Sequence, residues 1–160
     1  MDAATNVAAF AVVMASAVVA GGQLFCLVAV LPALSGWSSE LSAIVHRDAL
    51  TDRPHRFLRT FAMASVVSAI AFLTLLVIDD GFSLAAALAA TGLLAALVSG
   101  AISSREWPIN EEIKSWGDAP DLARYTELRR IWDVRHVRRT WLSTFALAAF
   151  LAAALVADSV

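Results

Sequence analysis

Five side chains in the last third of the chain have the types and spacing to do chemistry together. They are Tyr125, Arg129, Trp132, His136 and Arg139. Spacings of four and three residues place them on one face of an α-helix. Imidazole suits proton transfer near neutral pH, and guanidinium groups stabilise negative charge as it develops. The face indicates either the floor of an active site or a docking face that packs its aromatic rings. In the second case its arginines would pair with Glu106, Glu111, Glu112 or lipid phosphate.

The histidines do not form a pattern typical of a metal or haem site. No two of His46, His55 and His136 are three or four residues apart, and a metal centre needs several well-placed ligands. The single cysteine, Cys26, excludes a cysteine-based zinc cluster. We find no glycine-rich nucleotide loop, and the formal net charge of −2 does not favour a nucleic-acid partner. We therefore expect no metal and no cofactor.

The elements that must position these side chains have the composition of a membrane protein. Hydrophobic types make up 59% of the residues and charged types 16%, against roughly half and a quarter in soluble domains. Four uncharged stretches approach or exceed the about 20 residues that a membrane-spanning helix needs. They lack the polar face of a soluble bundle helix. We predict an all-α, single-domain four-helix membrane bundle over residues 1–160, with spans near 7–34, 57–78, 82–104 and 140–157.

Positive charge falls on one side of this predicted bundle. All 12 Lys and Arg residues lie in the first and third loops or their flanks, and basic loops stay in the cytoplasm. This predicts a plasma (inner) membrane protein with both termini outside and both long loops cytoplasmic. The chain start lacks the basic residues of a secretory signal, so we expect the first span to be retained. The five tryptophans lie beside the same loops, as an interfacial belt or a small layer folded onto the bundle.

The third loop predicts a cytoplasmic helical cap. Asn110 is a good N-cap for a short helix over 111–116, which Gly117 would end. Pro120 suits the start of the next helix. Nothing then breaks the helical pattern up to the end of the fourth span. One helix of about 36 residues would be roughly 54 Å long, so its first half must project from the membrane or bend along it.

Small and polar residues inside the spans predict close helix packing. Gly22, Gly92 and Gly100 would let helices approach, within one bundle or in a homo-oligomer. Gln23 is the one amide well inside a span, where it needs a partner. That partner is either a hydroxyl group of another span or a substrate in a cavity. The candidate hydroxyl groups belong to Ser68, Thr74, Thr91 and Ser99.

Three motifs resemble those of a known family. They are Phe25 followed by Val30-Leu31-Pro32-Ala33-Leu34, Pro108-Ile109-Asn110-Glu111-Glu112-Ile113, and Trp132-x-x-x-His136-x-x-Arg139-Thr140. With four spans and in this order, they resemble the anthrone oxygenase-like family of small four-span membrane proteins over essentially the whole chain. The resemblance implies oxidation of an anthrone to an anthraquinone by O₂, without metal or flavin.

Carried onto this chain, the resemblance implies roles for its motif residues. His136 would be the base that removes a proton from the activated carbon, and Arg139 and Asn110 would hold the resulting oxyanion. Trp107 and Trp132 would sandwich a flat aromatic substrate. A planar polyketide, a quinone or a lipid-like phenol would fit the same site.

Further substrate contacts are expected from Tyr125 and Arg129 on the helix face and from Gln23 in the first span. The Arg138-Arg139 doublet leaves open which arginine takes the motif role, and helical phase favours Arg139 because it continues the His136 face.

The competing hypothesis is a non-enzymatic membrane subunit. Its inner basic and aromatic face would dock a partner protein or anionic lipid. An enclosed pocket lined by Asn110, Trp132, His136 and Arg139 would favour the enzyme, and a flat exposed face with the same residues would favour docking. A transporter is disfavoured because no acid or base lies at the middle of a span.

Overall fold

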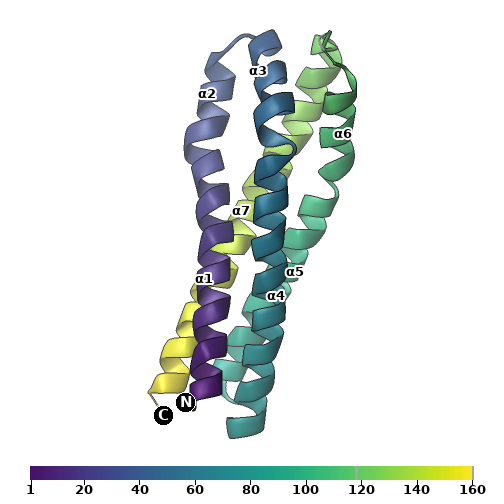
Figure 1. Cartoon of the computed structure of the whole chain (residues 1–160). Coiled ribbons are helices and arrows are strands. Elements are labelled where there is room, and N and C mark those ends of the chain that lie inside the picture. Colours follow the sequence, from purple (N-terminus) through teal and green to yellow (C-terminus); the bar gives the residue numbers. More distant parts are fainter. Residues whose placement is uncertain (118, 160) are drawn as a thin grey trace.

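The chain folds into helices that run up and down one long axis (Figure 1). The computed structural model describes residues 1–117 and 119–159, apart from the side chain of Arg53. The predicted all-α fold class is confirmed. In chain order the helical elements are α1 (Ala3–Phe25), the π-helical segment η1 (Cys26–Val30), α2 (Leu31–Gly36), α3 (Ser39–Val45), the π-helical segment η2 (His46–Leu50), α4 (Arg53–Asp80), α5 (Leu84–Ser104), α6 (Trp107–Ser115) and α7 (Leu122–Asp158).

Four helical stretches are long and apolar enough to cross a membrane. They cover Ala3–Gly36, Pro54–Asp80, Leu84–Ser115 and Leu122–Asp158. Each carries one of the predicted spans, and stretches of this length and composition indicate an integral membrane protein. The prediction of one unbroken helix into the fourth span is confirmed, because α7 runs for 37 residues.

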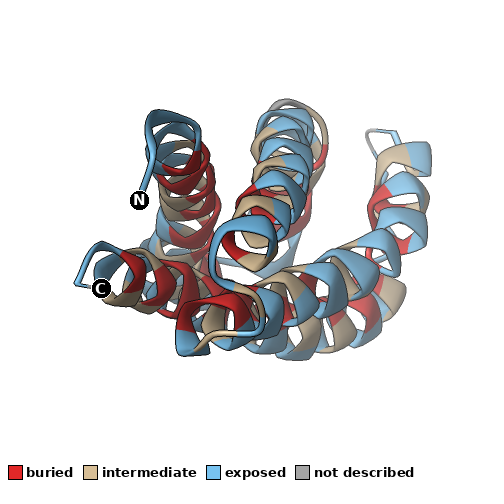
Figure 2. Cartoon of the chain, turned by 90° about the horizontal axis from the view of Figure 1, so that it is seen from below, coloured by how far each residue is buried: buried red, intermediate tan, exposed pale blue. Residues whose placement is uncertain are grey.

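The long helices pack as a closed ring of neighbours. Helix α1 packs against α4 and α7, and α5 packs against the same two helices. The chain reverses direction at each step, which is the up-down-up-down topology of a four-helix bundle. Figure 2 shows the buried positions of each helix turned toward its neighbours. The centre of this core is formed by the fully buried side chains of Val12, Phe72 and Phe150.

Two pairs of serines join the helices inside this core. The hydroxyl groups of Ser16 and Ser65 lie 2.7 Å apart between α1 and α4. Those of Ser99 and Ser143 lie 2.8 Å apart between α5 and α7. A small hydroxyl-bearing residue lets two backbones approach and gives each polar group a partner. These contacts fix α1 against α4 and α5 against α7.

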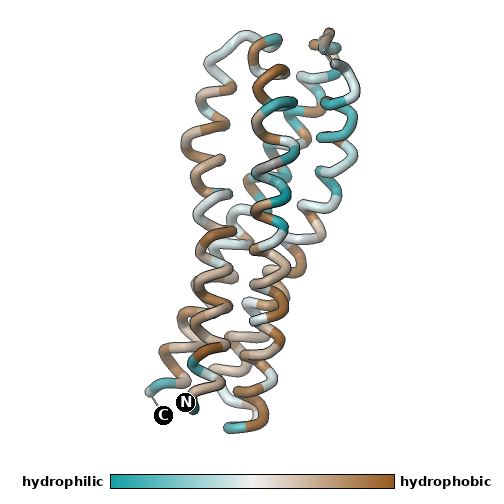
Figure 3. Tube along the Cα trace, viewed as in Figure 1, coloured by the Kyte–Doolittle hydropathy of each residue, from teal (hydrophilic) through white to brown (hydrophobic). Residues whose placement is uncertain are grey.

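A second hydrophobic cluster lies at the end of the bundle away from the two termini, where Figure 3 shows the hydrophilic residues concentrated. It buries Leu31 of α2, Ala43 of α3, Ile113 of α6 and Leu128 and Trp132 of α7. The sequence assigns this layer to the third loop alone. The structure adds α2 and α3, so both loops build it.

The prediction that Asn110 caps a helix is wrong. Helix α6 begins at Trp107 and carries Pro108 in its first turn, where a missing N–H costs nothing. Asn110 therefore lies inside the helix, and its N–H donates to the carbonyl oxygen of Glu106. Its side chain is buried and lies beside His46.

Two π-helical segments interrupt the regular geometry, η1 before Pro32 and η2 starting at His46. Pro32 has no N–H to donate to the preceding turn, so a local rearrangement just before it avoids a lost hydrogen bond and a clash. Segments of this kind are uncommon and are found frequently at functional sites. They draw attention to the residues around Cys26 and His46.

We expect Gly92→Ala to destabilise the bundle. A Cβ atom at Gly92 would lie 2.8 Å from the ring of Phe150, and that ring is fully buried and has no room to move. The free energy of unfolding should fall by about 1–3 kcal/mol, measured by thermal or denaturant unfolding of the purified protein in detergent.

Gly100→Ala is the matched control in the same helix, because a Cβ atom there meets nothing within 4 Å. Equal stability of the two variants would show that α5 and α7 are not packed as described.

Candidate functional site

The candidate site lies on the face of α7 that the sequence singles out. Tyr125, Trp132 and His136 are 3%, 4% and 1% exposed, and Arg139 is 9% exposed. Arg129 continues the same face with its side chain largely covered. The five side chains therefore share one buried face, as predicted, at the level where the four-helix core meets the second cluster.

His136 has both ring nitrogens engaged. Its Nε2 lies 3.1 Å from the backbone carbonyl oxygen of Gln23 in α1. Its Nδ1 receives hydrogen bonds from Arg139, from Nη2 at 2.7 Å and from Nε at 3.2 Å. A carbonyl oxygen only accepts and a guanidinium only donates. The ring is therefore the neutral tautomer with the proton on Nε2 and its lone pair directed at Arg139.

Arg139 is held by a buried carboxylate. Its Nη1 forms an ion pair with Oε2 of Glu106, which lies between α5 and α6 and is 1% exposed. The Ser103 hydroxyl accepts a longer bond from Nη1 at 3.4 Å. A guanidinium carries no lone pair and stays charged in this setting. It thus balances the carboxylate on one side while donating to the imidazole on the other.

The indole of Trp132 contacts the side chains of His136, Arg139 and His46. It stacks on His136 at 4.9 Å between ring centroids, with 14° between the planes. The Arg139 guanidinium lies over it at 5.8 Å, and the ring of His46 meets it at 4.9 Å and 63°. We call His46, Glu106, Trp132, His136 and Arg139, together with Gln23 and Asn110, the junction cluster.

Four buried side chains of the junction cluster have polar atoms that no other protein group satisfies. These atoms are Gln23 Oε1, His46 Nδ1 and Nε2, Glu106 Oε1 and Asn110 Oδ1. Buried polar groups are nearly always hydrogen-bonded, so each such atom calls for an explanation. His46 adjoins Trp132 and Glu106 pairs with Arg139, so the junction cluster is a place where a bound group would find partners.

His46 has unusual electrostatics for a histidine outside the spans. It is fully buried. Burial, and next the positive charge of Arg129, lower its pKa to about 4, while the neighbouring Asn110 amide acts in the opposite direction. The ring is therefore neutral at pH 7 and offers one N–H donor and one lone pair. The Tyr125 ring covers it from another side, 5.9 Å away.

The remaining predicted site residues occupy different positions. Trp107 is 39% exposed and its ring lies against His55, 5.2 Å away. That is a different ring contact from those of Trp132, and a sandwich of the two indoles around a substrate stays a prediction. Gln23 is buried, and its amide oxygen has no partner on another span.

Arg129 and Tyr125, two of the predicted substrate contacts, are hydrogen-bonded within the protein. Arg129 donates to Asp133 at 2.7 Å and to the Tyr125 hydroxyl at 3.4 Å. The two arginines of the Arg138-Arg139 doublet differ in their surroundings. Arg138 is exposed, whereas Arg139 bonds to His136 and Glu106.

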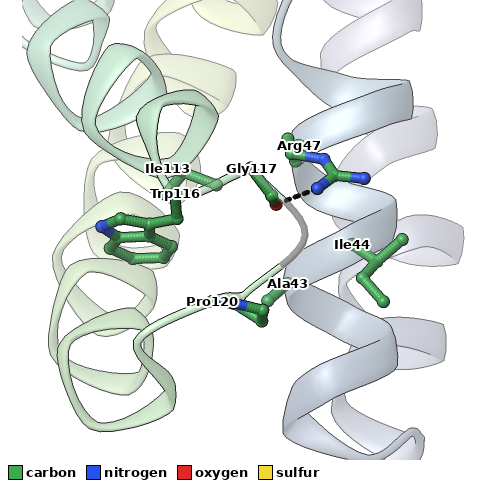
Figure 4. A pocket seen from close by; sticks show the side chains of 7 residues that line it. All are labelled: Ala43, Ile44, Arg47, Ile113, Trp116, Gly117 and Pro120. Atoms are coloured by element: carbon green, nitrogen blue, oxygen red, sulfur yellow. Dashed lines mark hydrogen bonds between the residues drawn. The ribbon is translucent and has the colours of Figure 1, made fainter.

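Two cavities of the structure lie away from the junction cluster. One, of about 280 Å³, is at the end that holds the termini, beside Asp2, Asp79 and Asp80. The other lies between α3 and the loop after α6, where Arg47 donates to the Gly117 carbonyl oxygen (Figure 4). It has no room for a water molecule.

His46 is a site residue that sequence reasoning did not select, and Glu106 was expected only as one of three acids with which the arginines of this face could pair. Each is far in sequence from the α7 motif and reaches it only through packing. One available signal for Glu106 was its place next to Arg105, which ends an uncharged span, because an acid at such a place requires a partner. His46 carried no comparable signal.

No group of three or more His, Cys, Asp or Glu side chains among the described residues is arranged to hold a metal ion. No family model, no curated protein and no solved structure matches this chain. The function therefore has to be inferred from the cluster itself.

We expect Arg139→Met to be strongly destabilising, because it leaves the buried Glu106 carboxylate without its partner. The cost should be about 3–5 kcal/mol of unfolding free energy. The double variant with Glu106→Gln should recover most of this loss in detergent unfolding experiments. A double variant no more stable than the single one would mean that the two groups do not form a coupled pair.

We expect His46 to make stability fall in mild acid. Its pKa is about 4 when folded and 6.5 when unfolded, so between these values the unfolded chain binds a proton that the folded chain does not. The free energy of unfolding should drop by up to about 3 kcal/mol as pH falls through this window. His46→Phe should lack that part of the decline. Thermal midpoints of both proteins from pH 7.5 to 4.5 measure the difference, and parallel curves would contradict it.

Proposed function

We propose that this protein is a membrane-embedded oxygenase that needs no cofactor and acts on a planar aromatic or phenolic substrate, of the anthrone-to-anthraquinone type. The proposal combines the motif resemblance with the arrangement of His136 and Arg139. The observation that carries it is the bond from Arg139 to Nδ1 of His136 inside a buried cluster with unsatisfied polar atoms.

This bond couples substrate binding to the release of a base. Arg139 Nη2 lies 2.7 Å from His136 Nδ1. A substrate carbonyl oxygen that takes over the guanidinium hydrogen bonds would leave the imidazole lone pair free. The oxygen would then lie next to the base, and the positive charge would already face the atom on which negative charge develops. The NH₂ group of the Asn110 amide would donate to the same oxygen, because its Oδ1 can only accept.

The reaction balances with O₂ as the only co-substrate. His136 takes a proton from the ring methylene carbon, and the resulting enolate-type anion is stabilised by Arg139. The carbanion carbon adds to O₂ and is oxidised, giving a peroxide that receives the proton back from the imidazolium. Loss of water from the peroxide leaves a second carbonyl group. One anthrone and one O₂ thus yield one anthraquinone and one water.

The docking alternative requires Asn110, Trp132, His136 and Arg139 on an exposed face, and all four are 9% exposed or less. Neither of the two cavities described above is lined by these residues, so the enzyme requires the cluster to open around its substrate. Binding of anionic lipid is compatible with either function, because Arg130 and Arg138 are exposed at the same end. We further propose that this end faces the cytoplasm from the plasma membrane, and that the small-residue faces allow a homo-oligomer.

Oxygen uptake by the purified protein given an anthrone tests the proposal. We expect uptake above the spontaneous rate, and His136→Ala should lower turnover by about 10²–10⁴-fold, as expected for loss of a general base. Arg139→Ala should be similarly impaired. The matched control is Arg138→Ala, which removes the neighbouring exposed guanidinium and should keep the activity.

Thermal unfolding of each variant separates lost chemistry from lost fold. A folded His136→Ala protein with the wild-type rate would remove His136 as the base. A wild-type protein without uptake above background would refute anthrone oxidation.

A further inference from the structure

His46 and Asn110 are two buried neighbours, and no motif role accounts for His46. His46 is 0% exposed and Asn110 is 4% exposed. The Asn110 side chain is the hydrogen-bonding neighbour that raises the pKa of His46, and no other protein group bonds to either imidazole nitrogen or to the amide oxygen. His46 also opens the π-helical segment η2 and meets the same Trp132 ring that stacks on His136. It therefore belongs to the junction cluster without belonging to the His136–Arg139 pair.

The chemistry of these atoms selects one kind of ligand group. A neutral imidazole provides one donor and one acceptor, and the unsatisfied atoms of Gln23, Glu106 and Asn110 are all oxygens that can accept. A hydroxyl group matches this set, because it can donate to the imidazole lone pair while the imidazole N–H is directed to the Asn110 amide oxygen. An ether or a ketone can only accept and leaves that lone pair unpaired.

An anionic group fits this place poorly. The guanidinium group of Arg139, inside the cluster, and that of Arg129, whose charge acts on His46, already have carboxylate partners in Glu106 and Asp133. A carboxylate or phosphate bound at His46 would add a further buried negative charge beside cations that are already paired.

We propose that His46 and Asn110 form a binding subsite for a neutral hydroxyl group of an aromatic ligand. The inference depends on the proposed function in one respect, that a ligand binds at the junction cluster. It does not depend on the proposed reaction. It names His46 as a recognition residue, distinct from the residues proposed to take the proton and hold the oxyanion.

Entry to this subsite requires the second cluster to open. His46 is sealed by Tyr125 and Trp132. The surrounding elements are joined by exposed or half-exposed polar contacts, such as the Lys114–Asp52 pair at 2.8 Å. Exposed ion pairs of this kind contribute little stability. Opening also exposes apolar side chains of the second cluster, such as Ile113 and Trp132, so a bound ligand has to cover that surface in place of the loops.

Binding of three matched probes to the full-length protein tests the proposal. The probes are 2-naphthol, 2-methoxynaphthalene and 2-naphthoate, measured by equilibrium dialysis against the protein in detergent micelles and against micelles alone. We expect 2-naphthol to bind about tenfold more tightly than the ether, the effect of about one good hydrogen bond. The carboxylate should bind no better than the ether.

His46→Phe keeps a ring of similar shape and removes both nitrogens, so it should abolish the preference for 2-naphthol and leave binding of the ether unchanged. Asn110→Leu should weaken the preference. His55→Phe, at a histidine outside the junction cluster, should retain it. Equal binding of alcohol and ether by the wild type, absence of saturable 2-naphthol binding, or an unchanged preference in His46→Phe would each overturn the proposal.

The melting temperature of the ligand-free protein separates a binding role of His46 from a purely structural role, because the two roles predict opposite effects of His46→Phe. A binding residue with unsatisfied nitrogens should cost stability, so His46→Phe should melt at the same temperature or higher at pH 7.5. A lower melting temperature with an unchanged probe preference would make His46 a structural residue satisfied by water. A preference that depends on His46, found in a protein that does not oxidise anthrone, would support the subsite and refute only the reaction.

Discussion

The arrangement of the site depends on one sealed ion pair, between Arg139 and Glu106. Removing either charge leaves the other buried without compensation, so the pair holds α7 in a fixed register against the junction of α5 and α6. The Ser99 hydroxyl of α5 donates to the backbone carbonyl oxygen of the same Arg139, which adds a second contact at the same place. The rings of His136 and Trp132 take their positions from this anchored turn.

Helix α7 joins two different environments in one rigid element. Its first half contributes Tyr125 and Trp132 to the second cluster, and its second half contributes Phe150 to the core of the bundle. Because the helix has no break between them, a displacement of the loops around His46 must bend α7 or tilt it within the bundle. The polar side chains of the junction cluster thus lie where α7 leaves the apolar core. The acceptor oxygens of Gln23 and Asn110 are buried there together with the Arg139–Glu106 pair.

The sequence was informative where one periodic pattern decides the structure. The spacing from Tyr125 to Arg139 repeats at the period of a helix, and uncharged stretches mark the spans, so both could be predicted. The pairing of Glu106 with Arg139 and the approach of His46 to Trp132 depend on how distant helices pack, and no local pattern encodes that. Asn110 was misplaced because Pro108 starts α6 a few residues earlier than a cap at Asn110 would require.

The two π-helical segments have a consequence for how such a site can diverge. A π turn accommodates one residue more than the α-helix around it, and one residue corresponds to a rotation of about 100°. Losing a single residue in a regular stretch would turn one side of the helix relative to the other, whereas losing one within η1 or η2 would restore a regular turn and leave the flanking faces in register. The chain can therefore gain or lose one residue at Cys26–Val30 or His46–Leu50 without moving Gln23 to a different face.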